Sequence, residues 1–240
     1  MYLSEIFEHL TYGELSTLKI GGLKDSGAIA AADYPQVISF INLGMIDLYK
    51  KFLLQEKNVV LELFDHITEY ELYYEHAQSN PDPIQDDITR YIADTGYEKP
   101  FEEDILQIHS AYDSNFEEIP LNDMNERSSI FTIGDDIVQV PYPGQGTFID
   151  LIFHAYPTKI PLDTATPSTY KIRLPQQFIS ALTAYVGFRA HISLPAGDAS
   201  KATEHFSRYS GICNEIRILG TYNKPTLSNM KALNQGWKTK

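Results

Sequence analysis

The chain has 240 residues, 43% of them hydrophobic, and carries 32 acidic against 19 basic side chains, a net charge of −13. This length allows one substantial core, or a core with an inserted second module, and the composition excludes a disordered protein. No apolar run approaches the roughly 20 residues that span a bilayer, and residues 1–10 do not resemble a signal peptide. The lone Cys213 excludes an intrachain disulfide. We therefore expect a soluble, intracellular protein with no membrane partner.

The acidic charge is concentrated in the middle of the chain. Residues 62–136 hold 20 acidic and 3 basic side chains, a net charge of −17, whereas the remainder carries +4. Such a segment is typical of a solvated acidic surface. It also disfavours tight binding to nucleic acid, because that affinity depends on cations that displace counterions from phosphate.

In chain order, the sequence first predicts two helices. A short helix is expected over residues 3–15 and a longer one over residues 34–52, with Asp33 as the N-cap of the second. The apolar residues of the longer helix recur at intervals of three and four, as on one face of an amphipathic helix: Tyr34, Ile38, Ile41, Met45, Leu48 and Phe52.

The period then changes to that of strands. Residues 59–63 and 68–74 are predicted to be strands joined by a turn at Asp65 and His66. Residues 79–100, with several Pro and Asp, are expected to leave the sheet and to include one helical turn around 86–93. Further strands are expected at residues 105–112, 130–133, 137–140, 148–156 and 170–174.

The C-terminal part predicts two more helices. The first is expected to begin at Pro175, with one stripe formed by Phe178, Leu182, Tyr185, Arg189 and Ile192. After a break at residues 195–198, a second stripe is formed by Ala199, Ala202, Phe206, Tyr209, Cys213, Ile216 and Gly220. The short loop predicts that these helices form an antiparallel hairpin, with Asp198 as a cap.

These elements predict an α+β fold in which N-terminal and C-terminal helices form a bundle around an inserted antiparallel β module. We expect N-terminal helices in residues 1–56, the β module in 57–174 and the helical hairpin in 175–220. Residues 221–240 have no apolar periodicity and no acid. They are expected to be either a frayed terminus or a basic arm that orders on a partner.

The sequence contains no consistent catalytic constellation. The seven histidines show no metal-ligand spacing, and there is no nucleophile elbow, phosphate-binding loop or dinucleotide loop. We therefore expect neither an enzyme nor a cofactor. Two carboxylate runs, Glu102-Glu103-Asp104 and Glu117-Glu118, are typical of solvated faces, although a calcium-binding module or a carboxylate- or metal-dependent enzyme stays open as an alternative.

Several short sequence segments resemble those of head-to-tail adaptor proteins of tailed bacteriophages. These are also called connector or neck proteins and include the tail-tubular-protein-A-like group. The most specific segment is Ile172-Arg173-Leu174-Pro175 leading into residues 181–189. The others are residues 12–16, Gly21-Gly22, residues 41–44, residues 48–52, residues 119–123 and His154-Ala155-Tyr156. The similarity covers about residues 1–220, with 79–100 as an insertion.

The resemblance implies a virion structural protein, assembled in the host cytoplasm, that forms a ring under the portal in the virion neck. Such rings generally have the twelve-fold symmetry of the portal, extend its DNA channel and dock the downstream tail or nozzle protein. The helical bundles would form the wall between subunits. A later neck or tail-tube component is the alternative within this class.

Two hypotheses about sites follow from this picture. Part of the acidic segment is expected to line the channel, so that double-stranded DNA passes without being bound. The candidate channel-lining residues are Glu102, Glu103, Asp104, Glu117 and Glu118. The basic arm is expected to contact the portal through Lys224, Lys231, Trp237 and Lys238.

Overall fold

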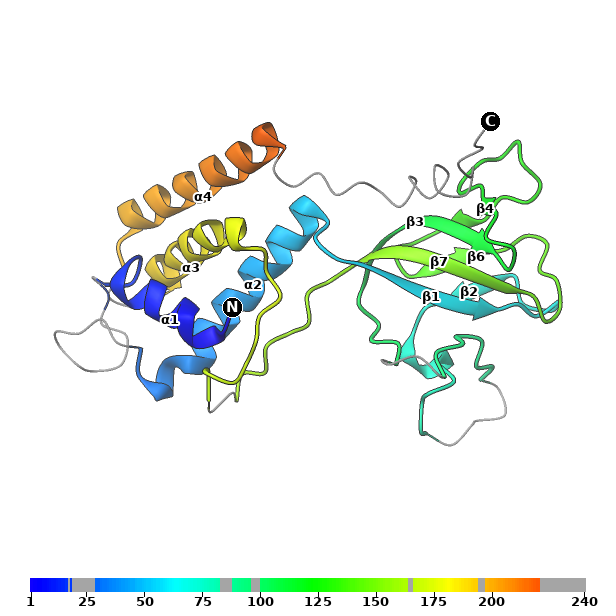
Figure 1. Cartoon of the computed structure of the whole chain (residues 1–240), viewed down its shortest axis with the longest axis horizontal. Coiled ribbons are helices and arrows are strands. Elements are labelled where there is room, and N and C mark those ends of the chain that lie inside the picture. Colours follow the sequence, from blue (N-terminus) through cyan, green and yellow to red (C-terminus); the bar gives the residue numbers. More distant parts are fainter. Residues whose placement is uncertain are drawn as a thin grey trace, which may run out of the picture. The chain divides into compact units, whose positions relative to one another are not determined.

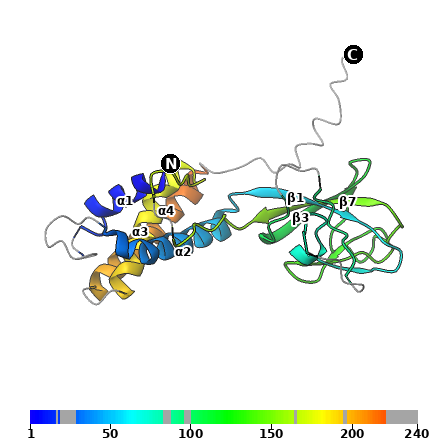
Figure 2. The ribbon, with the colours of Figure 1, turned by 90° about the horizontal axis from the view of Figure 1, so that it is seen from below.

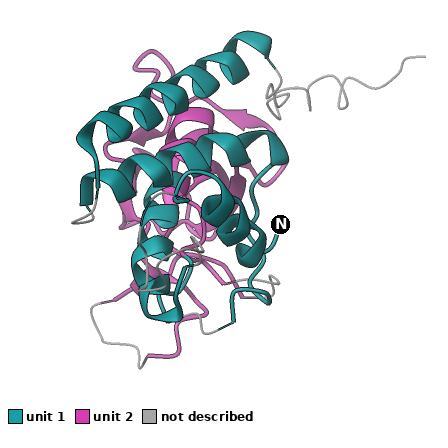
Figure 3. Cartoon of the chain, turned by 90° about the vertical axis from the view of Figure 1, so that its left-hand side faces the viewer, with its two compact units in different colours: residues 1–44, 160–240 teal, residues 45–159 magenta. Residues whose placement is uncertain are grey.

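The computed structural model describes residues 1–16, 18, 29–82, 88–95, 100–163, 166–193 and 197–220. The chain divides into two compact units, coloured separately in Figure 3: unit 1 comprises residues 1–44 and 160–240, and unit 2 comprises residues 45–159. The helices lie mainly in unit 1 and the strands in unit 2, so the fold is α+β with an inserted antiparallel β module (Figure 1).

Unit 1 is built from helices contributed by both ends of the chain. The N-terminal part supplies α1 (Leu3–Tyr12), the short η1 (Ala31–Asp33) and α2 (Tyr34–Phe52), which continues into unit 2. The C-terminal part supplies η3 (Gln176–Phe178), α3 (Ile179–Ser193) and α4 (Ala199–Leu219). The predicted helices are present, with three differences in their ends. The first ends at Tyr12 and not at residue 15, and Asp33, expected as an N-cap, is the last residue of η1. Pro175 has an extended backbone and precedes η3 instead of beginning it.

Helix α3 is buried on several sides, and the prediction of a single apolar stripe along it is wrong. Its buried residues are Ala181, Leu182, Thr183, Ala184, Val186, Gly187, Ala190 and His191. Ile192, expected on the stripe, is 58% exposed. Small residues around most of α3 let neighbouring segments approach it closely. The helix is therefore buried on several sides, and its sequence lacks the three- and four-residue repeat of apolar side chains that marks an amphipathic surface helix.

Helices α3 and α4 form the predicted antiparallel hairpin. Aromatic contacts pair early residues of one helix with late residues of the other: Tyr185 with Tyr209, Phe188 with Phe206, and His191 with His205, at ring-centroid distances of 5.1–5.3 Å. The Asp198 side chain caps α4 by accepting a hydrogen bond from the Ser200 amide at 2.8 Å. Residues 194–196 of the connecting loop lie outside the described residues.

The N-terminal residues are hydrogen-bonded to residues 170–172 in unit 1. The Leu3 amide donates to the Tyr170 carbonyl and the Ile172 amide to the Met1 carbonyl, both at 2.9 Å. Residues 170–174 were expected to form a strand of the β module, and this prediction is wrong. They form only an isolated bridge between Lys171 and Tyr2. Their alternating apolar residues, Ile172 and Leu174, are buried, but in the helical unit.

Unit 2 contains two antiparallel sheets around one core. The larger has the strand order β1-β7-β3-β4, from Glu56–Glu62, Phe148–Ala155, Ile105–Asp113 and Glu118–Ile119. Strands β1, β7 and β3 run side by side in Figure 2. The smaller sheet has the order β2-β6-β5, from Glu69–Glu71, Ile137–Gln139 and Phe131–Thr132. Fully buried apolar residues of the core include Leu61, Tyr70, Leu72, Ala111, Val138 and Leu151.

The expected strand over residues 68–74 is shorter and belongs to the second sheet. The turn at Asp65 and His66 is present, but β2 pairs with β6 and not with β1. Backbone hydrogen bonds from Val140 to Thr68 and from Leu72 to Asp136, both 2.8 Å, extend this pairing. The other edge of β1 is occupied by residues 91–93, since the Glu62 amide donates to the Tyr91 carbonyl and the Ala93 amide to the Val60 carbonyl, and the chain after the turn pairs in the second sheet.

The described part of residues 79–100 packs against β1. Ile92 forms isolated bridges with Leu61 and Ala77 and is fully buried. The carboxylate of Asp94 accepts hydrogen bonds from the amides of Ser79 and Phe101, which lie at the two ends of the excursion. Residues 88–95 contain no helix, so the expected helical turn is wrong there, and residues 83–87 lie outside the described part.

Gly187 of α3 lies in a closely packed part of the helical unit, next to Glu14 and His205. A Cβ at this position would lie 3.0 Å from the Glu14 Cβ and 3.2 Å from the His205 ring. The Glu14 carboxylate lies 3.0 Å from His205 Nδ1 and forms an ion pair with Arg208 at 2.9 Å. We predict that Gly187→Ala lowers the free energy of unfolding by about 1 kcal/mol, because overpacking costs roughly 1–3 kcal/mol and outweighs the better helix propensity of Ala.

The matched control is Gly211→Ala in α4, where no atom lies within 4 Å of the added Cβ. It should raise the free energy of unfolding by about 0.5–1 kcal/mol. Urea denaturation of both variants measures the difference, and equal effects would contradict close packing at Gly187.

Candidate functional site

The two compact units differ strongly in net charge. Unit 2 holds 23 acidic and 7 basic side chains, a net charge of −16, whereas unit 1 holds 9 acidic and 12 basic side chains, a net charge of +3. The acidic segment recognised in the sequence therefore belongs to one folded module. Its candidate residues lie at two places on that module, before β3 and at the β3–β4 turn.

Glu102 and Asp104 are already paired with a cation. Lys57 on β1 donates to Glu102 Oε2 and to Asp104 Oδ2, both at 2.6 Å. Burial favours the neutral amine of Lys57, but the hydrogen bonds and charges of the two carboxylates outweigh it, so the pKa of Lys57 is raised above its ordinary 10.5. The Asp104 side chain is only 14% exposed. Through Lys57, these two carboxylates connect the segment before β3 to β1, and the lysine neutralises part of their charge.

Glu103 lies between them but points to a different contact. It has a positive φ of 54°, and its carboxylate accepts a hydrogen bond from the Tyr74 amide at 3.2 Å. The left-handed backbone turns its side chain away from the direction of its neighbours. Glu103 is exposed and leaves charge on the surface.

Glu117, in the turn between β3 and β4, and Glu118, the first residue of β4, are both exposed. Asp113 organises this turn by accepting hydrogen bonds from the amides of Asn115 and Glu117, at 2.9 and 2.8 Å. The bond from the Glu117 amide is the main cause of a lowered pKa of Asp113. Phe116, at the tip, is 75% exposed and has a positive φ of 61°. The turn thus presents two carboxylates and an aromatic ring to the surroundings.

The four residues expected to contact the portal are not placed by the structure. Lys224, Lys231, Trp237 and Lys238 lie outside the described residues, in the segment 221–240.

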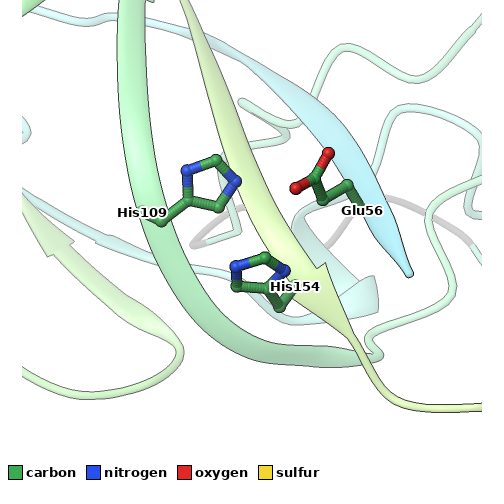
Figure 4. A group of neighbouring side chains, drawn as sticks. All are labelled: Glu56, His109 and His154. Carbon is green, nitrogen blue, oxygen red and sulfur yellow. The ribbon is translucent and has the colours of Figure 1, made fainter. Parts of the chain in front are cut away.

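The structure also brings together a group that the sequence did not indicate. Glu56 on β1, His154 on β7 and His109 on β3 each offer one ligand atom, and these atoms lie within 4.8 Å of one another (Figure 4). Glu56 is directly opposite His154 in the β1–β7 register. The two imidazole rings are 4.6 Å apart between centroids and tilted by 30°.

A bulge in β3 places His109 in this group. Ile108 pairs with Phe153 and Ser110 with Ile152, so His109 is an extra residue without a partner on β7. A bulge of this kind changes the direction of the side chain that it carries. His109 and His154 are 45 positions apart, and neither spacing nor composition signals their contact. Only the pairing of β3 with β7, and the position of the bulge, reveals it.

The environment of His109 favours a neutral imidazole. Burial lowers its pKa, although the charge of Glu56 acts in the opposite direction. Nδ1 lies 2.8 Å from the Ser110 hydroxyl, while Nε2 is buried and has no hydrogen-bond partner. A neutral imidazole with one nitrogen held by a hydroxyl can offer a lone pair on the other.

A second group consists of Glu71, Glu75 and His76. His76 stacks on Tyr91 at 4.5 Å, and its Nδ1 lies 3.0 Å from the Thr89 carbonyl. Both carboxylates are exposed. Exposed acidic groups commonly gather near a histidine without binding an ion, so this group is the weaker metal candidate.

Comparison with models of protein families gives no match, and comparison with curated proteins gives no significant match. Among the described residues, no helix combines the length and the apolar character needed to cross a membrane. Function is therefore inferred from the residues and their arrangement.

We predict that Lys57→Met lowers the free energy of unfolding by about 1–3 kcal/mol, because it leaves the half-buried Asp104 without its counterion. The matched control is Lys51→Met, which removes the exposed i,i+4 pair with Asp47 and should cost no more than about 0.5 kcal/mol. Thermal and urea unfolding measure both. Equal losses for the two variants would contradict a structural role for the Lys57 pair.

Proposed function

We propose that the protein is the head-to-tail adaptor of a tailed phage, a ring under the portal that extends the DNA channel and docks the tail. The observation that carries the proposal is the concentration of 23 of the 32 acidic side chains in the inserted β module, which gives that module a net charge of −16. The fold, with helices from both chain ends and a β module between them, is the one that the resemblance to adaptor proteins implies.

The proposed mechanism is electrostatic and not catalytic. A channel lined by carboxylates repels phosphate and offers no lysine clamp, so a duplex slides past without sticking. Among the five candidate residues, Glu117 and Glu118 best fit this role, because both are exposed at a turn. Glu102 and Asp104 fit it less well, since Lys57 neutralises part of their charge.

The surface of α4 supports assembly into a ring. This helix buries only Ala202, Tyr209, Cys213 and Ile216 within its own unit. Ile218 is 84% exposed, and Phe206 and Leu219 are exposed as well. Exposed apolar side chains on a long helix suit contacts with a neighbouring copy. In this proposal the helical units form the wall of the ring, the basic segment 221–240 contacts the portal, and the β module faces the tail.

We predict that the protein, mixed with the portal of its own phage, forms a complex with as many copies as the portal has subunits, most simply twelve. Native mass spectrometry measures the stoichiometry. Deletion of residues 221–240 should abolish binding while the circular dichroism spectrum and the unfolding transition stay unchanged. A full-length chain that stays unbound in the presence of the portal contradicts the proposal, and binding to a tail protein alone would favour a later neck component.

We predict that the double variant Glu117→Lys/Glu118→Lys slows DNA ejection from assembled virions severalfold, and more strongly at low ionic strength, because added lysines attract phosphate. The matched control is Glu8→Lys/Asp163→Lys, which changes the net charge equally at two exposed sites of unit 1. Light scattering or dye fluorescence after receptor addition measures the ejection rate. Equal rates for both double variants would place the β3–β4 turn outside the channel.

A further inference from the structure

We propose that Glu56, His109 and His154 form a binding site for one Zn²⁺ ion in unit 2. The proposal stands independently of the adaptor function, since it concerns the chemistry of three side chains within one sheet. It rests on the position of the residues in the sheet, the hydrogen bonding of the two His109 nitrogens and the preference of zinc for this donor set.

The three ligands come from three neighbouring strands and converge on one place. The order β1-β7-β3 puts Glu56, His154 and His109 side by side across the sheet, and Figure 4 shows the carboxylate and both rings directed toward a common space. Their ligand atoms lie within 4.8 Å of one another. Ligands about 2.0–2.2 Å from a tetrahedral zinc ion are separated by roughly 3.3–3.5 Å, so small side-chain rotations complete the geometry.

The second observation is the state of His109. Its Nε2 is buried and makes no hydrogen bond, and a buried polar atom in this condition ordinarily costs about 1–3 kcal/mol. Its Nδ1 is engaged by the Ser110 hydroxyl. A histidine ligand of zinc commonly has one nitrogen held by a protein oxygen while the other faces the metal. A bound ion would therefore satisfy the one nitrogen of His109 that the protein leaves without a partner.

The donor set matches zinc more closely than calcium or magnesium. Two imidazoles and one carboxylate are an established zinc ligand set that leaves a fourth position for water, whereas calcium and magnesium prefer oxygen ligands alone. His154 is 8% exposed and Glu56 is half-buried. One side of the site is thus shielded by the sheet, and the carboxylate supplies a negative charge to balance the ion.

The ion would hold β1, β7 and β3 together where β1 begins and β7 ends. The backbone there is irregular, because β3 carries register shifts between Ile105 and Gln107 and between Ile108 and Ser110. Binding to the folded state alone stabilises a protein by an amount that grows with ligand concentration above the dissociation constant. Zinc is therefore expected to raise the unfolding temperature of the full-length chain.

Isothermal titration of chelator-treated, full-length protein with zinc chloride tests the site. We expect one ion per chain and a higher unfolding temperature in zinc. His109→Gln should weaken binding by at least roughly tenfold, since even the loss of a hydrogen bond to a ligand typically costs 10- to 100-fold in affinity. Glu56→Gln removes a ligand but no buried ring, so it tests the site even if the histidine variants do not fold.

The matched control is His76→Gln, in the second histidine–carboxylate group, which should leave affinity and stoichiometry unchanged. Substitution with Co²⁺ should give the visible absorption of a tetrahedral complex in the wild type and not in Glu56→Gln. A wild-type chain that binds no zinc overturns the proposal. The proposal is also overturned if Glu56→Gln binds zinc as tightly as the wild type. It is overturned as well if His76→Gln loses zinc binding while the Glu56 and His109 variants keep it.

Discussion

The pairing of β1 with β7 is the constraint on which the rest of the structure depends. β1 follows α2 and β7 precedes the return to unit 1, so their antiparallel register brings the start and the end of the inserted module together. The Ala155 amide donates to the Gln55 carbonyl, and Lys50 lies over the Tyr156 ring. In unit 1, the Asn42 side chain both donates to and accepts from the backbone of Ile160, at 2.9 Å each. A module whose ends are adjacent can be inserted into a helical unit without disturbing its packing.

Features with a local sequence signal were predictable, and features that depend on distant partners were not. The amphipathic repeat of residues 34–52 and the Asp198 cap are local signals, and both helices form where they indicate. Residues 170–174 have the local pattern of a strand, but they pair with Tyr2 near the N-terminus, a partner that no local pattern specifies. The burial of α3 on several sides could not be predicted either, because small residues such as Ala184 and Gly187 do not add to a repeating pattern of large apolar side chains.

The number of acidic residues and their positions in the sequence were known in advance, but the ion pairs that they form in the fold were not. The sequence located the carboxylates of residues 102–104, yet it could not show that Lys57, 45 positions earlier than Glu102, neutralises two of them. The contact of His109 with His154 depends on a single bulged residue and was equally hidden. The result is a module with two kinds of acidic site: carboxylates held by a lysine at the base of β3, and carboxylates exposed at its turn. Only the second kind suits a surface that must repel a passing duplex.

The central claim is that an acidic β module, inserted into a nearly neutral helical unit, forms part of the DNA channel at the neck of a phage. An electron cryomicroscopy reconstruction of the virion neck tests it most directly. The account predicts a ring of copies in contact with the portal, with the β3–β4 turn of each copy facing the axis or the mouth of the channel on the tail side. A neck that lacks the protein, or a ring whose acidic modules all face outward, would contradict it.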